Sequence, residues 1–184
     1  MFLLRHGQSY FNLLYGETRV DPGIEDPHLT PLGHEQAVAA ARALASRRIT
    51  RLIISPYTRA LQTADPVLDV HAVPVEIQHL VRERAFFRCD VGSPPAVLAE
   101  RFPHHRFDHL PDRWWHGGIE TAEETVDRAN EFRALMATRD DQATTLLVSH
   151  WAFIVALTGV SLGNGELVEY DPGNPAPKVI DWES

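Results

Sequence analysis

The sequence of 184 residues contains very little cysteine and no long apolar run. Cys89 is the only cysteine, which excludes an internal disulfide and a zinc site built from four thiolates. No apolar stretch approaches the roughly 20 residues of a membrane-spanning helix. The apolar run at the start, residues 1–4, is too short for a signal peptide. These absences predict a soluble, cytoplasmic protein with no membrane partner.

Positive charge is also scarce, with 17 Lys and Arg against 25 Asp and Glu and a net charge of −8. Proteins that bind duplex nucleic acid neutralise phosphates with Lys and Arg, so nucleic acid is not the expected partner. A small anionic substrate needs only a local cluster of positive charge. The 44% of hydrophobic residues is usual for a globular protein. The length predicts a single domain over residues 1–184, because one core usually serves roughly 100–200 residues.

Short apolar runs alternate with helix signals along the chain. Runs of strand length occupy residues 1–5, 51–55 and 143–149. Helix-start signals and helical spacing of apolar residues predict helices at residues 31–44, 96–101, 121–136 and 151–157. One more helix is expected to start near Thr58, and Pro66 should end or kink it around Asp65.

Strands that are apolar on both faces and alternate with helices indicate an α/β fold. We expect a three-layer sandwich, in which a mostly parallel central sheet has helices on both faces. Turn residues around the short β-prone pieces 167–168 and 179–180 predict an antiparallel edge. Residues 88–118 hold four prolines and the pair Trp114-Trp115, which predicts an excursion packed over one end of the sheet.

Residues suited to phosphate chemistry follow three of these strands. Arg5, His6 and Gly7 follow the first, Arg59 lies near the start of the helix after the second, and His150 follows the third. Ligands of open α/β sheets bind beyond the carboxyl ends of the strands, where these residues would meet. A guanidinium matches phosphate oxygens, and an imidazole can act as the nucleophile. Each motif alone is more typical of a salt bridge, a capped helix or a structural histidine, but together they predict a phosphoryl-transfer site.

Several blocks of sequence occur in one order: Leu4-Arg5-His6-Gly7-Gln8-Ser9 with Asn12; Asp26-Pro27-His28-Leu29-Thr30 with Leu32-Gly33 and Gln36-Ala37; Ser55-Pro56 with Arg59-Ala60 and Gln62-Thr63-Ala64; and Ser149-His150. With these blocks the chain resembles the phosphoglycerate mutase-like branch of the histidine phosphatase superfamily across residues 1–160. The resemblance implies a phosphoglycerate mutase-like fold and chemistry through a phosphohistidine. It also implies that no metal or other cofactor takes part.

The resemblance implies a role for each matched residue. His6 would attack phosphorus and become phosphohistidine, while Arg5, Arg59 and His150 would hold the phosphate oxygens. The family uses an acidic proton donor after the next strand, and Glu83 stands at that place in the order. Substrate-binding residues are expected at Asn12, Gln8, Ser9, Trp151 and Arg82.

Glu83 needs a raised pKa to act as a general acid. Burial or a bound phosphate would raise it, whereas Arg82 and Arg84 would lower it if they face the carboxyl group. The alternative is that Glu83 is an ion-pair partner on a charged turn. In that case Glu17 or Asp90 is the nearest other carboxylate expected to overhang the site.

The chain departs from the family pattern in three places. Residues 13–25 form a longer stretch without the Phe-x-Gly-Trp that often follows the asparagine. Trp151 replaces the small residue that commonly follows the second histidine. The large insertion of cofactor-dependent phosphoglycerate mutases is missing, and residues 88–118 take its place. We expect this segment to be a lid that selects the substrate, with core packing as the alternative role of Trp114-Trp115.

The leading interpretation is a histidine acid-type phosphatase that hydrolyses a small phosphomonoester. A phosphoglycerate mutase must keep its bisphosphate intermediate from escaping, and the missing insertion argues against it. A non-catalytic phosphate-binding module is the third possibility, and the presence of His6 argues against it. Arg82, Arg84 and Arg88 leave open a second phosphate or a carboxylate on the substrate. The sequence does not indicate the natural substrate or the oligomeric state.

Four histidines, at positions 104, 105, 109 and 116, cluster within thirteen residues and raise the question of a metal site. Zinc sites in loops use histidines at such spacings. No pair of thiolates accompanies them, and the residues between them suggest a mixed surface. We therefore expect no functional metal site.

Overall fold

The computed structural model describes residues 1–174, which include one mixed sheet in the order β3-β2-β4-β1-β5. Its strands are β1 (Phe2–Arg5), β2 (Arg51–Ile54), β3 (Val75–Ile77), β4 (Thr145–Ser149) and β5 (Leu167–Glu169). Strand β5 pairs antiparallel with β1, and the other three pairings are parallel. The predicted mostly parallel sheet with an antiparallel edge is therefore confirmed. The second predicted edge piece, residues 179–180, lies outside the described residues.

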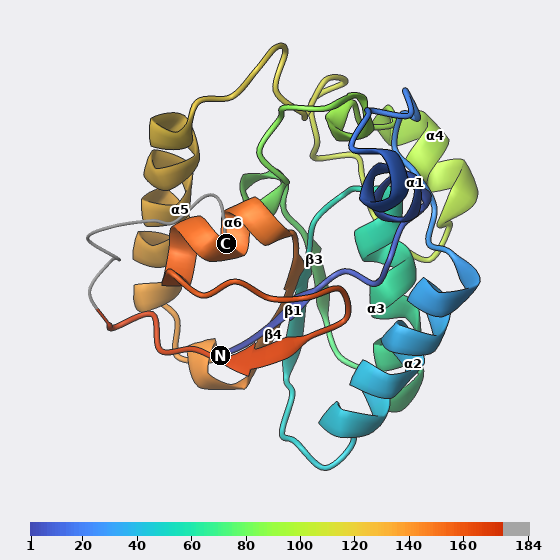
Figure 1. Ribbon diagram of the computed structural model, residues 1–184. Helices are drawn as coiled ribbons and strands as arrows, with labels where there is room; N and C mark the ends of the chain where they lie inside the picture. Colours follow the sequence, from blue (N-terminus) through green and yellow to red (C-terminus); the bar gives the residue numbers. More distant parts are fainter. Residues whose placement is uncertain (175–184) are drawn as a thin grey trace.

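Helices cover both faces of the sheet (Figure 1). They are α1 (Tyr10–Thr18), α2 (Pro31–Leu44), α3 (Thr58–Val70), α4 (Pro95–Arg101), α5 (Ala122–Ala137) and α6 (Trp151–Thr158). Figure 1 places α5 and α6 on one side of the sheet and α2 and α3 on the other. This arrangement confirms the three-layer α/β sandwich. Among residues 1–174, no helix is both long and apolar enough to span a membrane.

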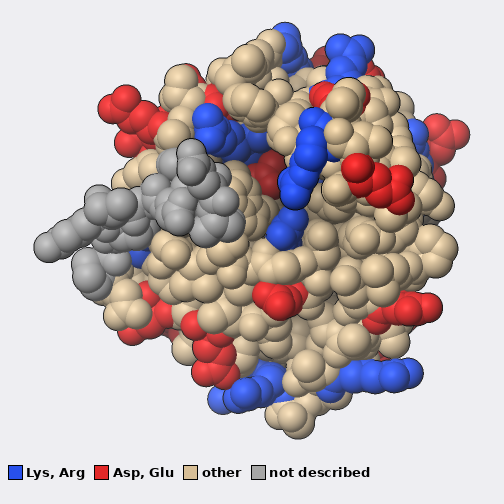
Figure 2. Space-filling view, viewed as in Figure 1, with Lys and Arg blue, Asp and Glu red and all other residues tan. Residues whose placement is uncertain are grey.

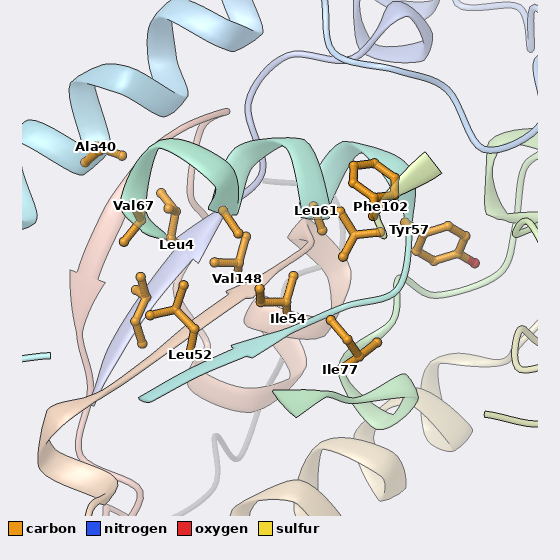
Figure 3. Packing of buried hydrophobic residues seen from close by; sticks show 14 of the residues in the cluster. Leu4, Ala40, Leu52, Ile54, Tyr57, Leu61, Val67, Ile77, Phe102 and Val148 are labelled. Carbon is orange, nitrogen blue, oxygen red and sulfur yellow. The ribbon is translucent and has the colours of Figure 1, made fainter. Parts of the chain in front are cut away.

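The central strands are buried on both faces because successive side chains point to opposite sides. Leu4 and Leu52 pack under α3 in the first core cluster, as Figure 3 shows. Leu3 and Ile53 belong to the second cluster, which includes Phe132 from α5 and residues of α6. Strands that are apolar at every position are therefore stabilised by burial on both sides, as expected of parallel strands between helical layers.

An end or a kink near Asp65 was expected; helix α3 continues past Pro66 to Val70, so the end is wrong. A proline inside a helix removes one hydrogen bond and costs about 3 kcal/mol. After the proline, Val67 is fully buried and Leu68 packs against the same core cluster. Full burial of a side chain such as Val67 gains about 1.5–3 kcal/mol, and the partial burial of Leu68 adds to this, which offsets the cost of the proline.

Helix α1 lies partly in the stretch 13–25, for which no element was predicted. Ser9 is its N-cap: the Ser9 hydroxyl accepts from the Asn12 backbone N–H, and Asn12 Oδ1 accepts from the Ser9 N–H at 3.0 Å. This reciprocal pair is a capping box with Asn in place of the more usual Glu or Gln. The sequence therefore contained a start signal for α1.

The segment after β1 crosses the start of α2 at very short range. A Cβ on Gly7 would lie 2.3 Å from the carbonyl oxygen of Gly33, and a Cβ on Gly33 would lie 2.1 Å from that of Gln8. The Thr30 N–H donates to the same Gln8 carbonyl at 2.9 Å. Only glycine at both positions allows this approach, which fixes the backbone next to His6.

Candidate active site

Strand register brings the predicted residues together. In the β1–β4 pair, Arg5 lies opposite Ser149, and in the β2–β4 pair, Ile54 lies opposite Val148. The residues that follow these strands, including His6 and His150, therefore meet at one edge of the sheet. The ring centroids of His6 and His150 are 5.0 Å apart.

His6 is held in one tautomer by its own neighbour. Its Nδ1 lies 2.7 Å from the Gly7 carbonyl oxygen, and because a carbonyl can only accept, Nδ1 carries the proton. Burial, with the charges of Arg59 and Arg5, holds the pKa of His6 well below its ordinary value. The imidazole is therefore neutral at neutral pH and presents an unprotonated Nε2, as a nucleophile requires.

Two buried nitrogens of residues adjacent to His6 have no hydrogen-bond partner among residues 1–174: Nε of Arg5 and Nδ1 of His150. Arg5 is anchored by Nη1, which donates to the Leu162 carbonyl at 2.6 Å. His150 is anchored by Nε2, which lies 2.7 Å from Ser55 Oγ. Burial lowers the pKa of His150 well below its ordinary value, so it too is neutral. Arg5 Nε carries a hydrogen, and His150 Nδ1 does so when the Ser55 hydroxyl donates to Nε2, so both can then donate to an anion bound at His6.

Arg59 is buried against the turn at residues 86–90. It donates from Nη1 to the Cys89 carbonyl at 2.9 Å and from Nη2 to Asp90 Oδ1 at 3.2 Å. Its guanidinium carbon lies 4.3 Å from the centroid of the Tyr57 ring. Asp90 Oδ2 accepts two backbone N–H groups of the same turn. A guanidinium has five N–H donors, so donors remain for phosphate oxygens.

Asp26 fixes the helix start that carries Arg59. Its carboxylate accepts from the Thr58 N–H at 2.8 Å and from the Thr58 hydroxyl at 2.7 Å. Ser93 donates to Asp26 Oδ2 at 2.6 Å. Asp26 is one of the residues that carry the resemblance, and its role in the structure is to accept hydrogen bonds from Thr58, the first residue of α3.

Glu83 reaches the same cavity from the turn after β3. Its Oε1 accepts from the Arg84 N–H at 2.9 Å and from the Ala152 N–H at 3.0 Å, which leaves Oε2 to carry a proton. Burial raises the pKa of Glu83, and the charge of Asp90 raises it further against the opposing effect of Arg59. This shift suits a general acid.

The turn that carries Glu83 is held by a buried ion-pair network that the sequence did not predict. Arg128 donates to the backbone carbonyls of Leu80 and Arg82 at 2.6 and 2.8 Å, and to Glu120 at 2.8 Å. Arg82 itself pairs with Glu120 at 3.1 Å and does not line the cavity. The expected substrate contact at Arg82 is therefore replaced by a role in this network.

The cavity at this site has a volume of about 520 Å³. Figure 2 shows several positively charged side chains in the upper half of one face and others along its lower edge; in residues 1–174 these are all arginines, since Lys178 is the only lysine. Beyond the catalytic candidates, the lining consists mostly of aromatic and basic side chains: Phe11, Tyr15, Arg19, Arg84, Phe86, Phe87 and Trp151. The sequence patterns did not predict most of this wall, although Phe11 and Tyr15 share one face of a helix.

The expected substrate-binding residues divide into two groups. Asn12 and Trp151 line the cavity. Gln8 and Ser9 do not: Gln8 Oε1 accepts from the Thr30 hydroxyl at 2.8 Å, and Ser9 caps α1. Both side chains hold α1 and α2 in place, so the substrate contacts expected at Gln8 and Ser9 are not found.

Within residues 88–118, only Cys89 and Asp90 line the cavity. Trp114 is buried in the first core cluster, 4.7 Å from the Tyr57 ring, and its Nε1 donates to the Ser93 carbonyl at 2.9 Å. Trp114 therefore has the alternative role of packing in the core.

A separate group, formed by Asp65 with His104 and His105, has metal-ligand spacing but lies outside the cavity lining.

Comparisons with known proteins agree with the resemblance. Residues 1–173 match the family model of the histidine phosphatase superfamily (branch 1). The glucosyl-3-phosphoglycerate phosphatase of Mycolicibacterium vanbaalenii is 33% identical over 89% of this chain and 74% of that protein. The fructose-2,6-bisphosphatase TIGAR B of Danio rerio is 37% identical over 46% of this chain and 33% of its own length.

Solved structures share the fold. A putative alpha-ribazole-5′-P phosphatase from Escherichia coli superposes with a TM-score of 0.64 at 20% identity, over 90% of this chain and 87% of that one. The native mycobacterial glucosyl-3-phosphoglycerate phosphatase gives 0.61 at 23% identity, over 91% and 87%. These structures show that the chain has the phosphoglycerate mutase-like fold. Because the family model matches residues 1–173, the chain belongs to branch 1 of the histidine phosphatase superfamily.

Proposed function

We propose that this protein is a phosphatase that hydrolyses a small phosphomonoester through a phosphohistidine on His6. The observation that carries the proposal is the state of His6, a buried neutral imidazole with Nε2 unprotonated. Arg5 and Arg59 line the same cavity, where they would offset the negative charge of a phosphoryl group. Glu83 lines it as well and supplies a group that can carry a proton.

In the first step, the lone pair of His6 Nε2 attacks phosphorus. The ester P–O bond breaks as the P–N bond forms, and protonated Glu83 donates its proton to the departing oxygen. The alcohol leaves, and Glu83 becomes a carboxylate. Arg5, Arg59 and Nδ1 of His150 stabilise the charge on the transferring oxygens.

In the second step, a water attacks phosphorus on the opposite side from His6. The Glu83 carboxylate takes a proton from that water, the P–N bond breaks, and its electron pair returns to Nε2. Inorganic phosphate forms, and both His6 and Glu83 are restored to their starting protonation states. One residue therefore acts first as acid and then as base.

We assign the protein to the acid-type subclass because of the protonation states that His6 and Glu83 need. His6 must be neutral, and burial lowers its pKa, so it remains active in mildly acidic solution. Glu83 must be protonated, which favours pH values near or below its raised pKa. The two requirements overlap on the acidic side of neutrality.

The cavity supports a substrate with a bulky body and a second negative group. Phe11, Tyr15 and Phe87 form a cluster with ring centroids 5.0–5.2 Å apart, which offers an apolar aromatic wall. Arg19 and Arg84 line the same space and could receive a carboxylate. Glucosyl-3-phosphoglycerate phosphatase, named for a substrate with a sugar ring and a carboxylate, is a relative over most of the chain. We therefore favour phosphorylated sugar acids and hydroxy acids.

A panel of phosphomonoesters tests the proposal. Phosphate release from 3-phosphoglycerate, sugar phosphates, alkyl phosphates and nucleotides would be measured for wild type, for His6→Ala and for His34→Ala, an exposed histidine outside the site. We expect wild type and His34→Ala to release phosphate, fastest from the phosphorylated acids, and His6→Ala to release none. Equal turnover by His6→Ala would overturn it. Isomerisation of 3-phosphoglycerate faster than phosphate release, with the 2,3-bisphosphate present, would indicate a mutase.

A further inference from the structure

Three side chains outside the active-site cavity lie close enough to share one metal ion. Asp65 is on α3, and His104 and His105 follow α4. A carboxylate oxygen of Asp65 and one ring nitrogen of each histidine all lie within 4.8 Å of one another. The cluster joins the segment after α4 to the helix that carries Arg59.

The distance between two of the ligand atoms suits a small tetrahedral ion. His104 Nε2 and Asp65 Oδ1 are 3.5 Å apart, which is long for a hydrogen bond. Two ligands of a tetrahedral zinc ion, with bonds of about 2.0–2.1 Å, lie about 3.4 Å from each other. Apart from this long contact with His104, Asp65 Oδ1 has no hydrogen-bond partner among residues 1–174. Its lone pairs are available to a cation.

His105 supplies the second, independent observation. Its side chain belongs to a residue only 7% exposed, and its Nε2 is buried without a hydrogen-bond partner in the described part of the chain. Imidazole nitrogens are among the commonest metal ligands in proteins.

Charge and access also suit a divalent cation. The side chains of His104 and Asp65 are 55% and 42% exposed, so water can reach the cluster and complete the coordination. Asp69 adds negative charge on the same helix, while His34 is the nearby basic group on α2. Two nitrogens and one oxygen favour zinc-like cations over Mg²⁺ and Ca²⁺, which prefer oxygen ligands.

We propose that Asp65, His104 and His105 form a binding site for a zinc-class divalent cation. The bound ion clamps the segment after α4 onto α3, roughly 9 Å along the helix axis from Arg59. The histidine cluster alone did not predict this site, because its carboxylate comes from an element 39 residues earlier in the chain. The site does not depend on the proposed phosphatase activity.

Zinc titration in a phosphate-free buffer at neutral pH tests the site. Calorimetry with Zn²⁺ alone should give one site per wild-type chain, and a hundredfold excess over Kd should raise Tm by roughly 5–10 °C. Asp65→Asn and His104→Ala change partly exposed side chains and should each weaken binding at least tenfold. His116→Ala removes a histidine of the same segment outside the cluster and should bind as wild type does. Mg²⁺ should not compete.

Crystals soaked in Zn²⁺ locate the ion. An anomalous peak between Asp65, His104 and His105 is the expected result. A peak only at His6 and His150, or equal affinity in wild type and His104→Ala, would overturn the proposal. If His104→Ala lowers Tm without zinc while zinc has no effect on wild type, the cluster is only a histidine–aspartate ion pair and the proposal is wrong.

Discussion

The pKa values of His6 and Glu83 are shifted in opposite directions within one cavity. Burial and the charges of Arg59 and Arg5 lower the pKa of His6. Burial and the charge of Asp90 raise the pKa of Glu83. Each group is thereby favoured in the form that phosphoryl transfer through His6 requires. Pairs of titratable groups pushed apart in this way are typical of acid–base catalysis.

Glu83→Gln tests the general acid at the residue scale. An alkyl alkoxide needs a proton to leave, whereas p-nitrophenolate does not. The variant should therefore hydrolyse alkyl phosphates roughly 10²–10⁴-fold more slowly, with a much smaller loss on p-nitrophenyl phosphate. Gln can still accept the two backbone N–H groups that bind Oε1. An equal loss on both substrates would show that Glu83 is structural.

The same variant has a predicted pH signature. Protonated Glu83 is the active form, so wild-type kcat/KM for alkyl phosphates should fall as pH rises through the raised pKa of Glu83. Gln does not titrate, and the variant's profile should lose this basic limb. Initial rates across the acidic and neutral range measure it. A basic limb that survives in Glu83→Gln would assign the proton to another group, with Asp90 the nearest candidate in the lining.

Arg59→Lys tests the forked contact. Arg59 already donates two hydrogen bonds to the turn at residues 86–90, and a lysine cannot make these and also hold phosphate oxygens. We expect kcat to fall by roughly 10²–10³-fold, the loss typical of one removed charge-stabilising donor, and Arg59→Ala to lose more. Single-turnover rates measure the chemical step. Near-wild-type rates in Arg59→Lys would exclude a bidentate role.

At the element scale, the docking of α2 against the residues after β1 holds His6 in place. Gly33→Ala would put a Cβ 2.1 Å from the Gln8 carbonyl, and backbone must move to admit it. Gly16 lies inside α1, where an added Cβ would have nothing within 4 Å, and Ala there should add about 0.5–1 kcal/mol of stability. Urea unfolding should show Gly33→Ala destabilised and Gly16→Ala stabilised. Two equally tolerated substitutions would contradict the close crossing.

Elements with local signals could be predicted from the sequence, and those set by packing could not. The capping box at Thr121 predicted α5, and Gly159 in the left-handed conformation ends α6 as expected. The end of α3 was misplaced because burial of Val67 outweighs the local effect of Pro66. Local rules do not include such long-range contacts.

The same distinction holds for the site. His6, Arg5, Arg59 and Glu83 stand next to strand ends or family motifs, and the structure brings them to one cavity. The aromatic wall and the pairs of Arg128 with Glu120 depend on which distant segments pack together. Neither follows from spacing in the sequence.

At the scale of the whole molecule, two core clusters lie against one sheet. Three buried imidazoles, His6, His105 and His150, have pKa values below the ordinary value of an exposed histidine. The unfolded chain therefore binds more protons than the folded one as pH falls below about 6.5. Folded-state stability must decrease in that range.

We predict that the free energy of unfolding falls between about pH 7 and about pH 5.5 by about 1 kcal/mol for each of these histidines. The raised pKa values of Glu83 and Asp65 oppose this loss at lower pH. Urea titrations at several pH values give the slope. His105→Phe should show a shallower slope than wild type, and a stability independent of pH over this interval would contradict the neutral buried state of the imidazoles.

Trapping of the phosphoenzyme tests the central claim most directly. Wild-type protein mixed with a ³²P-labelled phosphomonoester and quenched within one turnover should retain label that is stable to base and released by acid, as expected for a phosphoramidate. His6→Ala should retain none, while His34→Ala should be labelled as wild type is. Peptide mapping should place the label on the segment that contains His6. Equal labelling of His6→Ala, or turnover in wild type without any acid-labile label, would contradict a phosphohistidine mechanism.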